Sequence, residues 1–301
     1  MTSADAPDND EEAFRGRVHT VVLDWYAVAG RDLPWRAPAC SPWGVFVSEI
    51  MAQQTPIARV LEPWRRWLAR WPTPADLAAD APGEAIRAWD RLGYPRRAVA
   101  LHAAARAMVQ RHGGEVPREP EDLLALPGVG TYTAAAVSSF AFGNPLTVID
   151  TNVRRVLARV ALGEAQAGPT STRAERELAD AWMPADRGRA NAWNVAAMEL
   201  GALVCTARAP RCGECPVAGL CRWRGRGHPP YDGPAKRRQA YEGTDRQLRG
   251  RVLALARAAD RPVREEILLG VGEADRVARL LAALVAEGLL ERSSEGYHLP
   301  H

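Results

Sequence analysis

Four cysteines standing close together constrain this chain of 301 residues more than any other feature. They are Cys205, Cys212, Cys215 and Cys221, in the spacing C-x6-C-x2-C-x5-C. Four thiolates in one short loop can all reach a single metal centre, and all-sulfur ligation is typical of zinc or of an iron–sulfur cluster. The spacing departs from the paired C-x2-C units of zinc ribbons. Because Cys40 is the only other cysteine, chance is a poor explanation for the grouping.

Composition excludes several classes of protein. The hydrophobic content of 47% is enough to bury a core in one or two compact units with a small extra domain. No apolar run approaches the about 18 residues of a membrane span. The acidic first twelve residues lack the apolar region of a signal peptide. An odd number of cysteines, four of them clustered, fits the reducing cytosol better than a disulfide framework, so we expect a cytoplasmic protein.

The distribution of charge is more informative than the total. The formal net charge is only +3, but the segment from Cys205 to Arg251 contains eleven Lys or Arg against four acids. A basic segment beside a metal-binding loop fits a polyanionic partner such as nucleic acid. A solvated basic linker is the alternative interpretation.

Apolar residues recur at helical spacing along the chain, and Pro and Gly separate short segments. No window shows the sustained alternation of a strand, so the core is predicted to be all-α. Residues 1–13 are predicted to be a disordered tail. The predicted helices cover residues 14–29, 45–53, 56–70, 75–79, 84–92, 96–112, 119–125, 131–142, 152–160, 171–182 and 190–205.

A separate unit is predicted at the C-terminal end of the sequence. Residues 226–244 are rich in Pro, Gly and Arg and are predicted to be a linker. Within residues 245–301 we expect helices at 248–259 and 276–287 and a β-hairpin from Gly288. Pro262 is expected in the first turn of a further helix between them. Three helices and a hairpin outline a small winged-helix-like domain.

The segment Leu126-Pro-Gly-Val-Gly130, followed by a predicted helix, is a candidate phosphate site. Gly128 and Gly130 permit a tight turn and a close approach of backbone to a ligand. The helix that starts at Thr131 offers free N–H groups to an anion. This arrangement is the hairpin of a helix–hairpin–helix, which grips the DNA backbone without reading sequence. An ordinary glycine-rich turn between helices is the alternative.

Two carboxylates are candidates for catalysis. Asp150 precedes a helix, where a plain N-cap is the alternative role, and the helix dipole would hold its carboxylate ionised. An ionised carboxylate can stabilise a positive charge that develops during a reaction. Glu49 lies on a largely apolar helix, where a solvated surface Glu is the alternative. A carboxyl group in an apolar setting keeps its proton more readily, which suits a general acid.

Several motifs together resemble the MutY-type adenine DNA glycosylase family. Pro42-Trp-Gly-Val-Phe-Val-Ser-Glu-Ile-Met-Ala-Gln-Gln-Thr55 follows the family stretch P-Y-x-V-W-x-S-E-x-M-L-Q-Q-T, and the cysteine spacing is that of the family's [4Fe–4S] loop. The resemblance covers roughly residues 14–223, including Leu33-Pro-Trp-Arg36, Leu92-Gly-Tyr94, the glycine hairpin and the Asp150 segment. It implies a six-helix barrel subdomain with the hairpin at about residues 43–149. It also implies an iron–sulfur cluster subdomain built from about residues 14–42 and 150–225.

The resemblance also implies roles for individual residues. Glu49 would be the general acid that protonates adenine, and Asp150, hydrogen-bonded by Asn152, would stabilise the sugar or trap it covalently. Tyr132 would lie beside the catalytic carboxylates. The four cysteines would hold a [4Fe–4S] cluster. The residues implied to contact DNA or the extruded base are Trp35 and Arg36 in the base pocket, Gln54 and Tyr94 as wedges in the duplex, and Gly128, Gly130, Thr131 and Thr133 around the hairpin.

The sequence departs from the family pattern at four places. The family's second Tyr is Pro95 here, its pocket Leu is Ala52, and the Gln or Glu that touches adenine is Val195. The tail from residue 245 is short and lacks the Nudix-like domain that reads 8-oxoguanine in full-length family members.

We predict a monomeric, monofunctional DNA glycosylase that excises adenine opposite 8-oxoguanine or guanine, without true β-lyase activity. Three alternatives remain open: a mismatch thymine or uracil glycosylase, an endonuclease III-like lyase, and a non-enzymatic iron–sulfur DNA-binding regulator.

Overall fold

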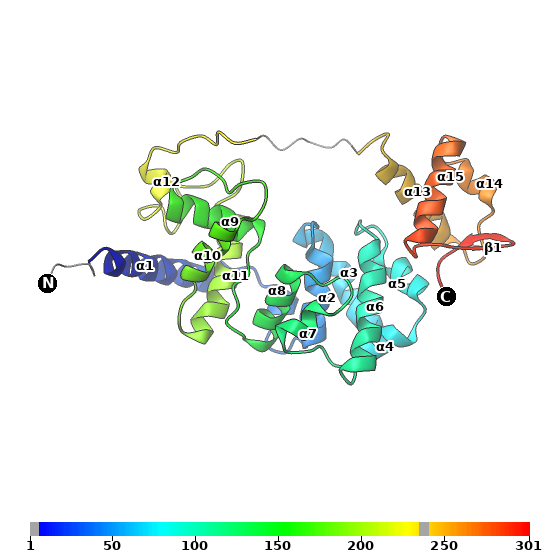
Figure 1. Ribbon diagram of the computed structural model, residues 1–301, viewed down its shortest axis with the longest axis horizontal. Coiled ribbons are helices and arrows are strands. Elements are labelled where there is room, and N and C mark those ends of the chain that lie inside the picture. Colours follow the sequence, from blue (N-terminus) through cyan, green and yellow to red (C-terminus); the bar gives the residue numbers. More distant parts are fainter. Residues whose placement is uncertain (1–5, 235–240) are drawn as a thin grey trace. The chain divides into compact units, whose positions relative to one another are not determined.

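The computed structural model describes residues 6–234 and 241–301, and it is mostly helical (Figure 1). The chain divides into two compact units. The first unit comprises Met1–Pro38 and Ala135–Lys236, and the second comprises Ala39–Ala134 and Arg237–His301. None of the helices in the described residues is long and apolar enough to cross a membrane.

The first unit is helical throughout. Its elements are α1 (Ala6–Ala29), the short 3-10 helix η1 (Pro34–Arg36), α9 (Thr151–Leu157), which continues as the π-helical turn η2 (Ala158–Leu162), α10 (Arg173–Ala181), α11 (Arg187–Leu203) and α12 (Arg222–Gly225). Helix α8 (Thr131–Phe142) starts in the second unit and ends in the first. The predicted all-α core is therefore confirmed.

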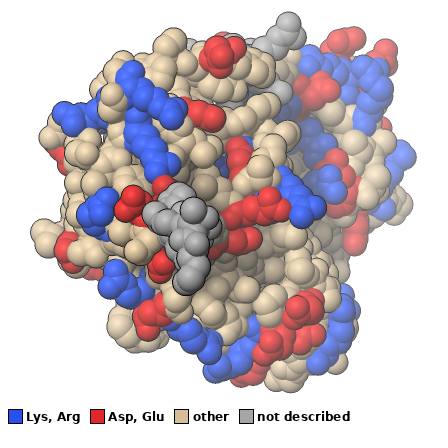
Figure 2. Space-filling view, turned by 60° about the vertical axis from the view of Figure 1, so that its left-hand side comes forward, with Lys and Arg blue, Asp and Glu red and all other residues tan. Residues whose placement is uncertain are grey.

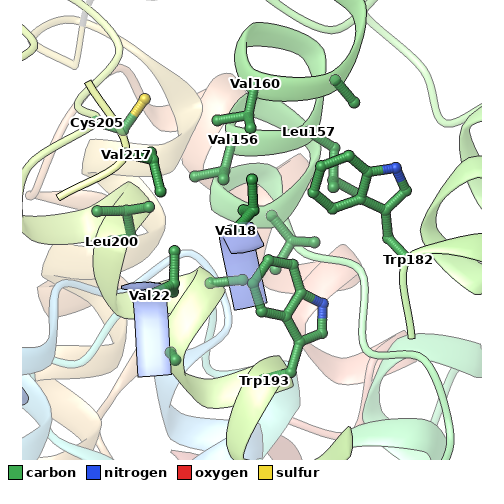
Figure 3. Close-up of a cluster of buried hydrophobic side chains, with 14 of the residues drawn as sticks. Val18, Val22, Val156, Leu157, Val160, Trp182, Trp193, Leu200, Cys205 and Val217 are labelled. Atoms are coloured by element: carbon green, nitrogen blue, oxygen red, sulfur yellow. The ribbon is translucent and has the colours of Figure 1, made fainter. Parts of the chain in front are cut away.

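The core of the first unit joins α1, α9 and α11 (Figure 3). Val18 and Val22 of α1 are fully buried, as the helical spacing of apolar residues predicted, and they pack with Trp193 of α11. The same cluster includes Cys205, so the base of the cysteine loop is part of the core. Val28, at the end of the same pattern, is instead 91% exposed.

One boundary prediction in the first unit was wrong. Residues 6–13 were expected to be disordered, but α1 begins at Ala6. Two contacts secure this extension, because Glu11 forms an ion pair with Arg222 and the Arg222 guanidinium lies 4.6 Å from the Phe14 ring centroid. Contacts with residues so distant in the sequence cannot be predicted from the local composition.

The second unit contains the helices on which the Glu49 segment and the glycine hairpin lie. They are α2 (Pro42–Ala52), α3 (Ile57–Arg70), α4 (Pro74–Ala79), α5 (Pro82–Trp89), α6 (Arg96–Arg111) and α7 (Pro120–Leu124). Four of them begin with Pro, which fits the first turn because its missing N–H has no helical partner there. Thr73 and Asp76 form a capping box at the start of α4.

Three helices and a hairpin follow in the second unit, as the sequence predicted. They are α13 (Asp245–Ala258), α14 (Glu265–Leu269), α15 (Ala274–Ala286), β1 (Glu291–Ser293) and β2 (Gly296–His298), and the two strands are antiparallel. Pro262 does not start a helix, which was predicted wrongly. Its neighbour Val263 instead pairs with Tyr297 and extends the hairpin, the two exchanging backbone hydrogen bonds of 2.8 and 2.9 Å.

The end of the sequence packs against α5. The backbone N–H of Gly83 donates to the carbonyl of Pro300 at 2.8 Å. A Cβ at Gly83 would lie 2.4 Å from that oxygen, so only glycine admits this contact. Arg87 on the same helix donates to the carbonyl of Arg257.

Candidate functional site

The four cysteines of the loop converge on one cavity in the first unit. The cavity is small and opens to solvent. Among the residues that line it are all four cysteines together with Arg159 and Trp223. Burial raises the pKa of the Cys215 thiol to about 11 and also raises that of Cys221. Neutral thiols are therefore favoured in this pocket unless a metal draws off their protons.

The donor set fits an iron–sulfur cluster better than a single ion. In the described part of the chain, no group of three or more His, Cys, Asp or Glu is arranged to hold one metal ion. Four thiols that line one cavity can together hold a cofactor of several atoms. Soft thiolate ligands and the absence of carboxylate from the lining agree with that choice.

Arg159 holds the cysteine loop from inside the unit. Its side chain is 2% exposed. Its guanidinium donates to the carbonyls of Ala165 (2.9 Å) and Thr206 (2.8 Å), and to the Sγ of Cys205 (3.3 Å). It also lies 4.6 Å from the Trp223 ring centroid. Arg159 therefore connects the first cysteine of the loop to the buried core of the unit.

Asp150 caps α9 in the same unit. Its carboxylate accepts from the backbone N–H groups of Asn152 (2.8 Å) and Val153 (2.7 Å), and from the Asn152 side-chain amide (2.6 Å). Burial raises the pKa of Asp150, and these three hydrogen bonds act in the opposite direction. The N-cap role and the predicted Asn152 contact are thus both present.

A hydrogen-bonded chain connects Asp150 to the cysteine loop. The Oδ1 of Asn152 accepts from Arg155 at 2.6 Å, and Arg155 also donates to the carbonyl of Cys205 at 2.7 Å. Gly201 allows α11 to approach, since a Cβ there would lie 2.6 Å from the Cβ of Asn152. The sequence argument missed Arg155 and Arg159. The two arginines lie one turn apart on a helix that also carries several apolar side chains.

Glu49 and Tyr132 meet in the second unit. Glu49 lies near the end of α2 and is 9% exposed, so the alternative of a solvated surface Glu is excluded. The Tyr132 hydroxyl donates to its Oε2 at 3.3 Å. Tyr132 therefore lies beside this carboxylate, as predicted. A buried carboxyl group that accepts a hydrogen bond from a tyrosine hydroxyl is suited to proton transfer.

The glycine hairpin has the shape that a backbone-binding turn requires. Gly128 has φ +76°, and a Cβ there would lie 2.6 Å from the Cβ of Ala100 on α6. At Gly130 an added Cβ would meet nothing within 4 Å, so this side is open to a ligand. Gly128, Gly130 and Thr131 are exposed. Thr133 is not, because its side chain is 2% exposed and accepts from Gln53 at 3.1 Å. The side chain of Thr133 thus points inward, and its contact with DNA stays a prediction.

The two predicted wedge residues share an unusual backbone. Gln54 has φ +53° and Tyr94 has φ +48°, and both are exposed, Tyr94 to 46%. Residues other than glycine seldom adopt this left-handed conformation. Two exposed tips held in such a state are typical of functional turns.

Arg36, next to Trp35 in the sequence, is held by the buried Glu199 of α11. The Glu199 side chain is 1% exposed and binds Arg31 and Arg36, the latter at 3.0 Å. These arginines keep the pKa of Glu199 below its ordinary value against the effect of burial. Trp35 is 8% exposed. The sequence argument missed Glu199, although a lone acid in the apolar stretch Ala196–Ala202 was a signal.

Comparison with known proteins agrees with these sites. The model of the HhH-GPD superfamily base excision DNA repair proteins matches residues 47–184. That of the iron–sulfur binding domain of endonuclease III matches residues 205–221, which span the four cysteines. The chain is 49% identical to an adenine DNA glycosylase of Mycobacterium tuberculosis, covering 92% of this chain and 91% of the relative. The chain belongs to the adenine DNA glycosylase family of the HhH-GPD superfamily. It is thus a base excision repair glycosylase that binds DNA and carries an iron–sulfur cluster.

More distant comparisons bear on individual parts of this family member. An adenine DNA glycosylase of Homo sapiens is 45% identical over 71% of this chain but only 40% of its own length. A thermostable thymine-DNA glycosylase superposes with a TM-score of 0.65 at 28% identity, covering 72% of this chain and 99% of that one. An endonuclease III–DNA covalent intermediate shares the fold at 24% identity, with a TM-score of 0.60 over 71% of this chain and 98% of that one.

Proposed function

We propose that this glycosylase excises adenine mispaired with 8-oxoguanine or guanine, by hydrolysis of the N-glycosidic bond. The observation that supports it most strongly is Glu49, which is buried on an apolar helix and bound by the Tyr132 hydroxyl. Two mycobacterial relatives of similar length, 49% and 47% identical, are adenine DNA glycosylases. The matched share of this chain is too large to leave out all of residues 245–301, so these relatives share at least part of that region.

Each carboxylate has a separate task in this proposal. Glu49, protonated, gives its proton to a ring nitrogen of the leaving adenine. Asp150, ionised and fixed by three hydrogen bonds, stabilises the positive charge that develops on the sugar, or bonds to it covalently. Water then completes the hydrolysis. The iron–sulfur cluster supplies a rigid cysteine loop, and the residues that would hold it are Cys205, Cys212, Cys215 and Cys221.

The remaining site residues position the DNA. Gly128, Gly130 and Thr131 bind a backbone phosphate through their exposed turn. Gln54 and Tyr94 enter the duplex as the base leaves it, and Trp35 and Arg36 receive the base. Basic and acidic side chains are interspersed on the face in Figure 2 rather than merged into one basic patch. We therefore infer that these specific contacts matter more than bulk charge for orientation on DNA. We further propose a monomer that acts in the cytoplasm.

The test is a single assay with five duplexes. They carry adenine opposite 8-oxoguanine, adenine opposite guanine, thymine opposite guanine, uracil opposite guanine, or thymine glycol, and each is heated with alkali after incubation. We expect strand breaks only at adenine. Glu49→Gln and Asp150→Asn should each lower adenine excision by at least about 100-fold while duplex binding stays intact. The matched control is Glu62→Gln, because Glu62 is an exposed acid on the neighbouring helix α3.

Three results would contradict the proposal. Release of thymine or uracil in place of adenine would support a mismatch glycosylase on this scaffold. Sequence-specific binding with no base release would support a regulator. Near wild-type excision by Asp150→Asn would remove Asp150 from the mechanism even if adenine is the substrate.

A further inference from the structure

Arg97, the second residue of α6, binds both turns that carry the left-handed residues Gln54 and Tyr94. Its Nη1 donates to the carbonyls of Ile50 and Met51, each at 3.0 Å, and to that of Gln53. Its Nη2 donates to the carbonyl of Gly93 at 2.9 Å. One guanidinium therefore joins two loops that are some forty residues apart in the sequence.

The first of these loops is the end of the helix that carries Glu49. Ile50 and Met51 lie in the last turn of α2, whose carbonyls have no partner within the helix. A cation at this position is also favoured by the helix dipole. The Nη2 of Arg97 also donates to the hydroxyl of Thr55 at 3.0 Å, so Arg97 binds the residues on both sides of Gln54.

The second loop is bound from two sides. The carbonyl of Gly93 accepts from Arg97 and also from the indole of Trp89 at 2.9 Å. The guanidinium carbon of Arg97 lies 5.2 Å from the Trp89 ring centroid and 5.4 Å from that of Tyr94. Its Nε is buried and has no hydrogen-bond partner among the described residues, so the side chain is held by its two terminal nitrogens.

We propose that Arg97 is a positioning residue, which locks the Gln54 and Tyr94 turns into one rigid pair for insertion into a DNA duplex. This rests on the wedge roles given above and deepens them. A residue other than glycine keeps a left-handed backbone conformation only where surrounding contacts hold it there. Arg97 supplies such contacts to both turns at once. Burial lowers the pKa of Arg97 to about 10, so its charge is kept at neutral pH.

A plain helix cap would give the same contacts to α2, so the experiment must separate capping from wedging. The probe is a duplex with 2-aminopurine, a fluorescent adenine analogue, opposite 8-oxoguanine, and its emission rises as the base unstacks. Stopped-flow traces give the unstacking rate, and this readout needs no excision. The comparison ligand is the same duplex with an abasic site, from which no base has to leave.

Arg97→Gln should slow unstacking about tenfold or more, because extrusion depends on both wedges. Its affinity for the abasic duplex should stay within about threefold of wild type. Arg97→Lys should restore only part of the rate, since one ammonium offers three N–H groups from a single atom. The matched control is Arg96→Gln, which removes the same charge from a neighbouring side chain that is 72% exposed and contacts Glu287. It should unstack the probe at the wild-type rate.

A double-mutant cycle tests whether Arg97 acts through the wedges. In a Gln54→Ala, Tyr94→Ala background, Arg97→Gln should cost less than about twofold. Equal losses in unstacking and abasic binding, an additive effect in that background, or wild-type unstacking by both Arg97 variants would overturn the inference. If Arg97→Gln fails to fold, Arg97→Lys decides the same comparisons. A wild type that unstacks the probe yet releases no adenine would refute the proposed function and leave this inference standing.

Discussion

Replacing Arg159 by Met should loosen the cysteine loop and release iron. Met keeps an unbranched side chain of similar reach but removes every donor of the guanidinium. The carbonyls of Ala165 and Thr206 and the Sγ of Cys205 would each lose their hydrogen bond. The stacking of the guanidinium on Trp223 would disappear as well.

The loss of stability depends on which of the lost hydrogen bonds water can replace. Ala165 is buried, so its carbonyl would stay unsatisfied at a cost of about 1–3 kcal/mol. Thr206 is partly exposed and its carbonyl can bind water, so it adds little. Loss of the buried cation–π contact adds about 1–2 kcal/mol. A total of about 2–5 kcal/mol corresponds to a fall in melting temperature of roughly 5–20 °C.

The assay follows the visible absorbance of the cluster during heating, together with iron per chain before and after. Wild type should hold about four irons per chain. The matched control is Arg226→Met, because Arg226 is exposed and donates to the carbonyl of Leu162 at 2.8 Å. Its cost should stay below about 0.5 kcal/mol. If Arg159→Met melts and retains iron like the control, the buried guanidinium does not hold the loop and the reasoning fails.

Two further predictions concern Asp150 and Gly83. Burial raises the folded-state pKa of Asp150 above its ordinary value of 3.8, so its protonated form is favoured by folding and that stabilisation is lost as pH rises through the folded pKa. Denaturant unfolding should therefore show Asp150→Asn gaining stability relative to wild type between about pH 4 and pH 7, and an unchanged difference would contradict the sign. Gly83→Val should release the end of the sequence, since its Cβ would lie 2.4 Å from the carbonyl oxygen of Pro300. Hydrogen exchange at residues 296–300 should rise, whereas Gly16→Val, with open space around it, should leave that exchange unchanged.

The sequence predicted those parts of the site that local spacing determines. The cysteine loop, the hairpin and the cap at Asp150 each depend on residues within one short segment. Periodicity predicted the core helices because one face of each is buried. The predicted start of a helix was wrong where a contact with a distant residue stabilises its first turns, as the ion pair with Arg222 does for α1.

The sequence could not predict the contacts that join distant segments. Four charged residues bind partners on two or more elements: Arg97, Arg155, Arg159 and Glu199. From the sequence alone, an Arg or Glu on a helix is expected to lie at the surface. Thr133 is a further residue whose surroundings the sequence did not predict. Its place after the glycine hairpin suggested a DNA contact, yet its position in the first turn of α8 turns it toward Gln53.

The last prediction is that this enzyme has no true β-lyase activity. A lyase attacks the sugar with a lysine amine and forms a Schiff base. The position two residues after Gly130, where lyases of this scaffold have that lysine, is Tyr132, and its hydroxyl is bound to Glu49. Lys236 is the only lysine of the chain, and it lies outside the residues that the structure describes. Arg cannot replace it, because a guanidinium stays protonated at working pH.

We therefore expect an intact abasic strand that breaks only on heating with alkali, and little covalent complex when borohydride is present during turnover. Lys236→Arg should leave both results unchanged. Tyr132→Lys is the informative counterpart, because it places an amine beside Glu49 in the same turn of α8. If the position of the side chain relative to the sugar prevents Schiff-base formation, Tyr132→Lys will form no trapped complex either. If the missing amine is the only obstacle, trapping will appear in Tyr132→Lys and in no other variant. Efficient trapping by wild type that survives Lys236→Arg would overturn the monofunctional assignment.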